Sequence, residues 1–361
     1  MRQVALYRDD SERWGLAHGD ALRLLTWLPA RSVDAVLTDP PYALGFRGET
    51  WDQPGDSQLV SPAQAFQAWT QEWASAAWRV LKPGGYLAAF GAPRTSHRLI
   101  AGVEDAGFEI RDLLVWLFGS GVPKSRRLPG GAGTALKPAY EPILLARKPP
   151  DGTFVGTRER WGTGALEIEA ASVIGPGEPS RWPPNVVLSH ASSCTARRCT
   201  TDCPAALLDR ARPDVRPSRF LYCAKTSTVE REVGCERLPA RSHEIFSKGR
   251  RPERRRHNIH PTVKPIELMS WLVRLACPEG GVVLDPFAGS GSTGIAAVRE
   301  GRGFFGIERE HDYIEIATAR LAYWSHRELP SASVDGRPVG GRSPLFLPTD
   351  QAIHRPKEVM S

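Results

Sequence analysis

The chain has 361 residues, with 47 Lys and Arg against 40 Asp and Glu, a formal charge of +7 and an apolar content of 41%. These values exclude wholesale disorder and allow a sizeable core, either in two domains or in one large α/β domain with an insertion. No apolar run approaches the ~18 residues of a membrane span, and the first residues lack the apolar core of a secretory signal. Six cysteines are too few for a disulfide scaffold, so we expect a cytoplasmic protein.

The positive charge is concentrated in one segment. Residues 181–258 hold 17 Lys and Arg against 8 Asp and Glu, while the rest of the chain is slightly acidic. The same segment holds five of the six cysteines. A polyanionic partner for this segment is one interpretation of the charge, and a solvated arginine-rich surface is the other.

Strand and helix patterns alternate through the first 150 residues. Apolar residues recur at helical spacing between 61 and 81, where Ser61-Pro62 supplies an N-cap and a first helical residue and Lys82-Pro83-Gly84-Gly85 is expected to end the helix. Runs of β-branched residues predict strands, such as residues 33–38, which end at two prolines. We expect strands at 14–18, 33–38, 86–90, 110–118 and 142–147, and helices at 21–28, 61–81 and 95–106.

The remainder of the chain divides into an irregular part and an ordered part. Residues 150–258 are rich in Pro and Gly and have weak periodicity, which predicts an inserted domain, and residues 330–361 predict a flexible tail. Between them we expect helices at 265–276, 293–300 and 313–324, and strands at 281–284 and 304–307. Alternation at both ends predicts one doubly wound, mostly parallel sheet, formed by residues 1–149 and 259–329.

The glycine-rich segment GVVLDPFAGSGSTG, residues 281–294, combines a strand, an acidic residue, a tight turn and the start of a helix. Glu308 follows at the end of the next predicted strand, as in a nucleoside-binding βαβ unit. Asp285 and Pro286 stand where a pyrophosphate would lie, so this turn suits a cationic ligand without phosphate, such as the amino-acid end of S-adenosylmethionine. A strand–helix turn without any ligand is the alternative.

A second motif, Asp39-Pro40-Pro41-Tyr42, follows the predicted strand 33–38, where ligands bind in open α/β sheets. The Asp39 carboxylate and the Pro40 carbonyl offer two acceptors to a planar –NH2 group. Accepting both N–H bonds favours a pyramidal nitrogen and stabilises the positive charge that develops when this nitrogen attacks a methyl group. Tyr42 offers a face on which a flipped base can stack. An ordinary Asp-Pro turn is the alternative.

LTDPPY and VLDPFAGSGSTG together resemble the amino-methyltransferases that methylate exocyclic nitrogens of DNA. Their order resembles the permuted beta class of that family, as do His260-Pro-Thr-Val-Lys264-Pro265 and His18-Gly19-Asp20. The resemblance covers about residues 14–321 and extends to stretches that are similar to phage- and prophage-type members: FGSGVPKS, GTALKPAYEPILLARKP, WGTGALEI, RWPPNVVLSH and SRFLYCAKTS. It implies a circularly permuted Rossmann-like α/β methyltransferase fold, a seven-stranded, mostly parallel sheet with one antiparallel strand, and an inserted target-recognition domain.

The resemblance also implies roles for individual residues. The catalytic motif is Asp39, Pro40, Pro41 and Tyr42. Asp20 meets the adenine of S-adenosylmethionine, Asp285 its amino-acid part and Glu308 its ribose. The full expected cofactor set is Asp20, Thr262, Lys264, Asp285, Phe287, Ala288, Gly289, Ser290, Gly291 and Glu308.

The expected reaction is site-specific methylation of adenine N6 in duplex DNA, because D-P-P-Y is less usual than S-P-P-Y in enzymes that methylate cytosine N4. The alternatives are cytosine N4, an RNA amine, and a catalytically inactive DNA-binding accessory protein with the same fold. The partners that we expect are double-stranded DNA, a cognate restriction endonuclease and a second copy of the chain, and the location is the cytoplasm, at the nucleoid.

Two clusters in the basic segment add hypotheses. His190, Cys194, Cys199 and Cys203 are four soft ligands within 14 residues, which suits a structural Zn²⁺, although unrelated thiols are the alternative. Arg250, Arg251, Arg254, Arg255 and Arg256 are expected to contact DNA phosphates, as are Lys124, Arg126 and Arg127 of the long loop 119–139; a solvated basic linker is the alternative for the arginine cluster.

Trp51, in a polar loop after D-P-P-Y, is a candidate for facing the base or the cofactor, whereas Trp69 and Trp73 are expected in the core.

Overall fold

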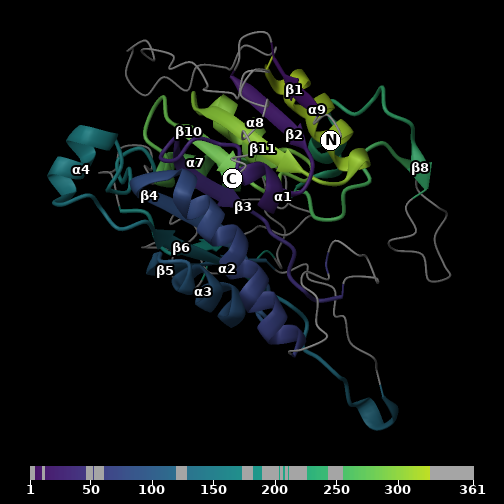
Figure 1. The fold of residues 1–361 in the computed structure, drawn as a ribbon. Coiled ribbons are helices and arrows are strands. Elements are labelled where there is room, and N and C mark those ends of the chain that lie inside the picture. Colours follow the sequence, from purple (N-terminus) through teal and green to yellow (C-terminus); the bar gives the residue numbers. More distant parts are fainter. Residues whose placement is uncertain are drawn as a thin grey trace, which may run out of the picture.

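The computed structural model describes residues 5–9, 13–45, 52, 61–118, 128–172, 182–188, 203, 206–207, 210, 226–242 and 255–325. These residues form one mixed sheet with helices on both faces (Figure 1). Among them, no helix is long and apolar enough to cross a membrane.

The sheet has nine strands in the order β1-β2-β11-β10-β3-β4-β6-β5-β7. The seven strands from β2 to β5 are the predicted sheet, and β6 is antiparallel to both of its neighbours, as expected. The three-residue strands β1 and β7 extend the two edges and were not predicted. The strands are β1 (Leu6–Arg8), β2 (Trp14–His18), β3 (Val33–Thr38), β4 (Leu81–Phe90), β5 (Glu109–Leu117), β6 (Tyr140–Arg147), β7 (Val186–Leu188), β10 (Val282–Asp285) and β11 (Gly303–Glu308).

The two halves of the chain interleave in this sheet. Strands β10 and β11 come from the end of the chain and lie between β2 and β3 from its beginning. Residues 283–284 pair in parallel with residues 35–36, so D-P-P-Y and the glycine-rich turn follow adjacent strands at the same edge of the sheet.

Helices cover both faces and close two hydrophobic cores. One core contains side chains of α1, α2 and α3, including Trp73, and the other contains side chains of α7, α8 and α9, including Trp271. The helices are α1 (Ala21–Leu25), α2 (Pro62–Val80), α3 (Ser96–Asp105), α4 (Phe154–Trp161), α6 (Thr228–Glu232), α7 (Ile266–Ala276), α8 (Ser292–Arg299) and α9 (His311–Ser325), with a 3-10 turn η3 (Pro129–Gly131).

Helix α2 begins and ends where the sequence predicts, but the segment after it differs from the prediction. Ser61 and Gln64 form a reciprocal capping box, and Pro62 occupies the first turn. The segment Lys82-Pro83-Gly84-Gly85 was expected to be a terminating turn, but it belongs to β4, which begins at Leu81 directly after the helix. A shift in the register between β3 and β4 accommodates the proline, and Lys82 Nζ lies 2.6 Å from the Asp34 carboxylate on β3.

Some of the described parts of the predicted insert, residues 150–258, lie against the sheet. Strand β7 pairs in parallel with β5, and α4 packs near β4, with Thr163 Oγ1 donating to the Pro83 carbonyl at 2.6 Å. Two short strands, β8 (Arg241–Ser242) and β9 (Arg255–Arg256), form a separate ribbon. The predicted division into catalytic halves, insert and tail remains a prediction.

Candidate active site

A cavity of about 1340 Å³ opens at the carboxyl ends of β2, β3, β10 and β11. Its volume exceeds the ~300–1,000 Å³ of an ordinary small-molecule site, so it has room for two ligands side by side. Of the predicted catalytic and cofactor-binding residues, the cavity is lined by Asp20, Asp39, Pro40, Pro41, Tyr42, Thr262, Lys264, Asp285, Phe287, Ala288, Gly289, Ser290 and Glu308. Gly291 is not in the lining; it caps the N-terminus of α8 with a φ of +77°.

The backbone of the D-P-P-Y turn is held from two sides. The Asp52 carboxylate accepts a hydrogen bond from the Tyr42 amide at 2.9 Å and another from the Leu44 amide at 3.1 Å. From the other side, Thr95 Oγ1 donates to the Tyr42 carbonyl at 2.9 Å. The turn is therefore fixed independently of any ligand.

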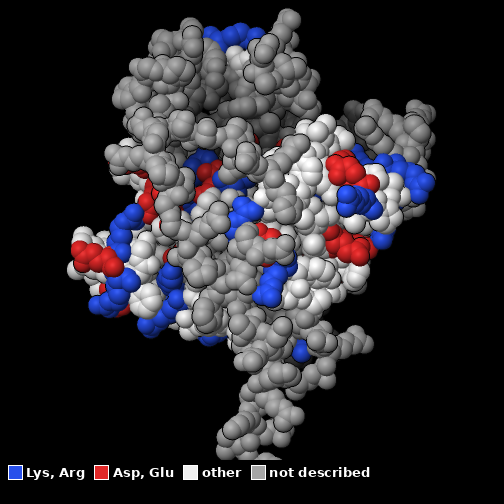
Figure 2. Space-filling model, turned by 90° about the horizontal axis from the view of Figure 1, so that it is seen from above, with Lys and Arg blue, Asp and Glu red and all other residues white. Residues whose placement is uncertain are grey.

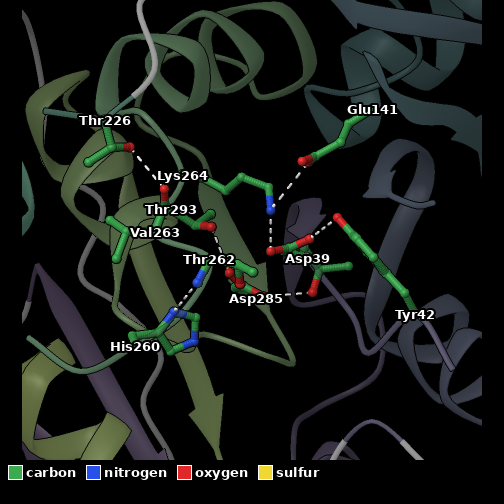
Figure 3. Close-up of polar contacts among 11 residues, drawn as sticks. Asp39, Tyr42, Glu141, Thr226, His260, Thr262, Val263, Lys264, Asp285 and Thr293 are labelled. Carbon is green, nitrogen blue, oxygen red and sulfur yellow. Dashed lines mark hydrogen bonds and ion pairs between the residues drawn. The ribbon is translucent and has the colours of Figure 1, made fainter. Parts of the chain in front are cut away.

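Both oxygens of the Asp39 carboxylate face protein donors (Figure 3). The Tyr42 hydroxyl donates to Oδ1 at 2.5 Å, and the Lys264 ammonium donates to Oδ2. Burial and the negative charges of Asp39 and Glu141 raise the pKa of Tyr42 well above its ordinary value, so its hydroxyl keeps the proton that it donates.

Asp285 connects the two predicted motifs. Its Oδ1 accepts from Thr38 Oγ1 at 2.7 Å and from the Phe287 amide at 3.1 Å, and its Oδ2 accepts from Thr293 Oγ1 at 2.6 Å. Burial nevertheless raises the pKa of Asp285 to about 6. One carboxylate thus holds the last residue of β3, the glycine-rich turn and the start of α8 together.

Glu308 shapes the other side of the glycine-rich turn. It accepts from the Gly289 amide at 2.8 Å and from the Glu310 amide at 2.7 Å, and burial raises its pKa to about 7. Gly289 has a φ of +52°, and a Cβ placed on it would stand 2.6 Å from His260 Nε2. A larger residue would strain the backbone and displace His260, so glycine is favoured here and backbone rather than side chain faces the cavity.

The segment from His260 to Pro265 is fixed by α6, which comes from the predicted insert. Thr226, just before this helix, donates from Oγ1 to the Val263 carbonyl at 2.9 Å, and Glu230 accepts from the Ile266 amide at 2.7 Å. Lys264 was predicted to bind the cofactor, and this role remains a prediction. Its Nζ contacts Asp39 and lies 3.5 Å from Glu141 Oε2, between the two carboxylates in Figure 3.

The sequence did not place Trp69 or Glu141 at the cavity, although both line it. Trp69 packs against the core, as predicted, but it is only half-buried and also lines the cavity, with its ring 5.4 Å from that of Phe287. The helical stripe predicted its inward direction correctly, but not that the neighbouring space is hollow. Glu141 had no local signal either, because only the antiparallel pairing of β6 beside β4 places it near Asp39.

The structure describes only a few of the residues that were predicted to contact DNA or to bind metal, and their roles remain predictions. Arg255 and Arg256 form β9 outside the cavity lining, and Arg255 donates to the Ala240 carbonyl at 2.9 Å. Cys203 is buried. On the face shown in Figure 2, the described Lys and Arg side chains are interspersed with Asp and Glu. The residues that lie outside the described part are Trp51, Lys124, Arg126, Arg127, His190, Cys194, Cys199, Arg250, Arg251 and Arg254.

The mixed sheet with its antiparallel β6, and the cavity that joins both motifs at the strand ends, define an α/β methyltransferase. The chain belongs to the N6/N4 DNA methylase family, whose model matches residues 33–319. It is 27% identical over 342 residues to DNA adenine methyltransferase YhdJ of Escherichia coli, covering 93% of this chain and 92% of that protein. It is 23% identical over 313 residues to Type II methyltransferase M2.DpnII of Streptococcus pneumoniae, covering 85% and 88%.

A solved structure has the same fold. The cytosine-N4-specific PvuII DNA methyltransferase aligns with a TM-score of 0.54 at 18% identity, covering 86% of that chain and 85% of this one. This likeness concerns the fold and leaves the choice between adenine and cytosine open.

Proposed function

We propose that this protein transfers a methyl group from S-adenosylmethionine to the exocyclic N6 of an adenine that is flipped out of duplex DNA. The observation that carries the proposal is the position of Asp39 in the same cavity as the glycine-rich turn, joined to it by the Thr38–Asp285 hydrogen bond. DNA as the substrate rests on the family to which the chain belongs.

The residues of the turn fit S-adenosylmethionine, which supplies an electrophilic methyl group. At Gly289 the backbone itself borders the cavity, and Glu308 is held at the end of β11 by two backbone amides. Each carboxylate oxygen accepts up to two hydrogen bonds, so Glu308 retains capacity for ribose hydroxyls. No phosphate-binding group is needed, in agreement with the acidic Asp285 beside the turn.

The residues of D-P-P-Y act on the target base. Asp39 and the Pro40 carbonyl accept the two N–H bonds of the amine, which directs the nitrogen lone pair toward the methyl group. The Tyr42 ring provides the stacking surface for the flipped base, and its hydroxyl keeps Asp39 oriented. After the transfer, the methylated nitrogen loses one proton, to Asp39 or to water.

Adenine is favoured over cytosine by the aspartate of D-P-P-Y and by the similarity to YhdJ, which is named an adenine methyltransferase. Incubation with duplex DNA, followed by digestion to nucleosides and mass spectrometry, tests the choice. N6-methyladenine is expected, and N4-methylcytosine would overturn the choice of base. Methylation of RNA alone would overturn DNA as the substrate, and failure to bind S-adenosylmethionine in calorimetry would favour the inactive accessory protein.

The basic insert extends the proposal to DNA recognition. We propose that residues 150–258 read the target sequence and that the arginines of 250–256, with Lys124, Arg126 and Arg127, contact phosphates. Replacing the five arginines by glutamine is expected to make the salt dependence of DNA binding shallower, and an unchanged slope contradicts the contact. The zinc site at His190, Cys194, Cys199 and Cys203, the partner endonuclease and the homodimer likewise remain proposals.

A further inference from the structure

The Asp39 carboxylate is one member of a row of three charged side chains inside the cavity. Lys264 Nζ donates to Asp39 and lies 3.5 Å from Glu141 Oε2, so one ammonium serves two carboxylates (Figure 3). The three side chains come from different parts of the sequence: the end of β3, the segment before α7 and the start of β6.

The residues around Lys264 bury its side chain and hold it in this position. Its side chain is 7% exposed, and its ammonium lies 4.9 Å from the centre of the Phe90 ring and 5.8 Å from that of Tyr42. Hydrogen bonds from the α6 region hold the backbone on either side, at Val263 and Ile266. Burying an ammonium is costly unless it is paired, so the placement requires the two carboxylates.

The Lys264 ammonium supplies a positive charge beside Asp39. Burial opposes the charge on Lys264, but Asp39 and Glu141 outweigh it, and the pKa of Lys264 is raised. The other groups that face Asp39 are the Tyr42 hydroxyl and the carboxylates of Glu141 and Asp285. Lys264 is thus the one cation placed against Asp39 among the described residues, amid negative neighbours.

We propose that Lys264 is the positioning residue of the reaction: its ammonium, anchored by Glu141, holds the Asp39 carboxylate turned toward the target amine. This inference rests on the proposed function. An ionised carboxylate has about four acceptor sites, of which Tyr42 and Lys264 use two. Asp39 can therefore accept the amine while both protein donors stay in place.

The test compares Lys264→Met, Lys264→Arg and the control Lys82→Met in single-turnover methylation at neutral pH. Lys82 pairs with the buried Asp34, which lies on β3, the strand that precedes Asp39, but outside the cavity lining. Lys264→Met is expected to slow methyl transfer at least tenfold at saturating duplex DNA. Its affinity for duplex DNA is expected to stay near that of the wild type, because the ammonium acts on Asp39 rather than on the DNA.

The matched variants separate positioning from folding. Lys264→Arg, which keeps the positive charge, is expected to recover most of the lost rate, and Lys82→Met to leave the rate unchanged. S-adenosylmethionine binding to Lys264→Met, measured by calorimetry, is expected to equal that of the wild type. An unchanged rate of transfer in Lys264→Met overturns the inference, as does loss of cofactor binding, which would make Lys264 a cofactor ligand.

A crystallographic comparison keeps the inference testable apart from activity. Structures of the wild type and Lys264→Met are expected to differ in the orientation of the Asp39 carboxylate, and an identical orientation overturns the positioning role. A wild-type protein that methylates no nucleic acid would instead contradict the proposed function, so the two failures are distinguishable.

Discussion

Thr38 Oγ1 donates a 2.7 Å hydrogen bond to Asp285 Oδ1, between residues separated by 247 positions in the sequence. Thr38 ends the strand that carries D-P-P-Y, and Asp285 ends the strand that carries the glycine-rich turn. Both residues are buried. This bond therefore sets the spacing between the part of the cavity that we assign to the base and the part that we assign to the cofactor.

Removing this bond is expected to lower both stability and cofactor affinity. Thr38→Val keeps the shape of the side chain but takes one donor from the buried Asp285, which costs about 1–3 kcal/mol of unfolding free energy. Chemical denaturation and calorimetry measure the two effects. The control is Thr70→Val on α2, because the Thr70 hydroxyl is also buried but has no hydrogen-bond partner among the described residues. Equal effects of the two substitutions would contradict the role of the bond.

Asp39→Ala is expected to separate binding from chemistry. Asp39 accepts the amine only during the reaction, so its loss is expected to lower the rate of methyl transfer roughly 100-fold or more. The affinity for S-adenosylmethionine should stay near that of the wild type, because the glycine-rich turn is unchanged. Tritium transfer to duplex DNA and calorimetry measure the two quantities. Full methylation by this variant would rule out the proposed mechanism.

Gly289→Ala is expected to abolish cofactor binding by blocking the turn. Alanine at this position would have to adopt a φ of +52°, and its Cβ would stand only 2.6 Å from His260 Nε2. Gly162→Ala provides the control, since Gly162 has a φ of +75° at the C-terminus of α4 with no atom within 4 Å of the added Cβ. Both variants should lose about 1 kcal/mol to backbone strain, but only Gly289→Ala should lose affinity in calorimetry. Normal binding by Gly289→Ala would contradict the assignment of this turn.

The affinity for S-adenosylmethionine is expected to rise with pH through about 7. Burial raises the pKa of Glu308 to about 7, so the carboxylate that we assign to the ribose becomes ionised only across that range. Hydroxyl donors favour the ionised form, and binding should therefore strengthen between pH 6 and pH 8. Glu308→Gln removes the titrating group and should remove that part of the pH dependence. Identical pH profiles for the two proteins would contradict the role of Glu308.

The same raised pKa has a consequence for folding. A carboxyl group whose pKa is higher in the folded than in the unfolded state stabilises the fold most below its unfolded value, near 4.5. That stabilisation is lost as the pH rises through about 7. Relative to Glu308→Gln, the wild type should therefore lose unfolding free energy on the order of 1–3 kcal/mol as the pH rises across this range. Chemical denaturation at pH 5 and pH 8 measures it, and a constant difference would argue against the raised pKa.

Local sequence patterns were sufficient for both motifs and for most of the helices and strands outside the predicted insert. The capping box at Ser61 and the helical stripe of α2 depend on residues a few positions apart, and so does the glycine-rich turn before α8. The start of β4 was missed because Pro83 and two glycines normally end an element. Here β3 pairs with Leu81 before them and with Tyr86 after them, so the four residues form a register shift within β4, where Lys82 contacts Asp34.

Only the tertiary structure decided which side chains meet. Lys264 and Asp39 are 225 positions apart, and Glu141 reaches them because β6 runs antiparallel beside β4. Trp69 packs against the core and also borders the cavity for the same reason: the surrounding space depends on elements remote in the chain. The sequence by itself determined the two motifs and the alternating strands and helices, because side-chain periodicity and turn chemistry are local. The partners of Asp39 follow from the strand order, and that order depends on contacts between segments that are distant in the sequence.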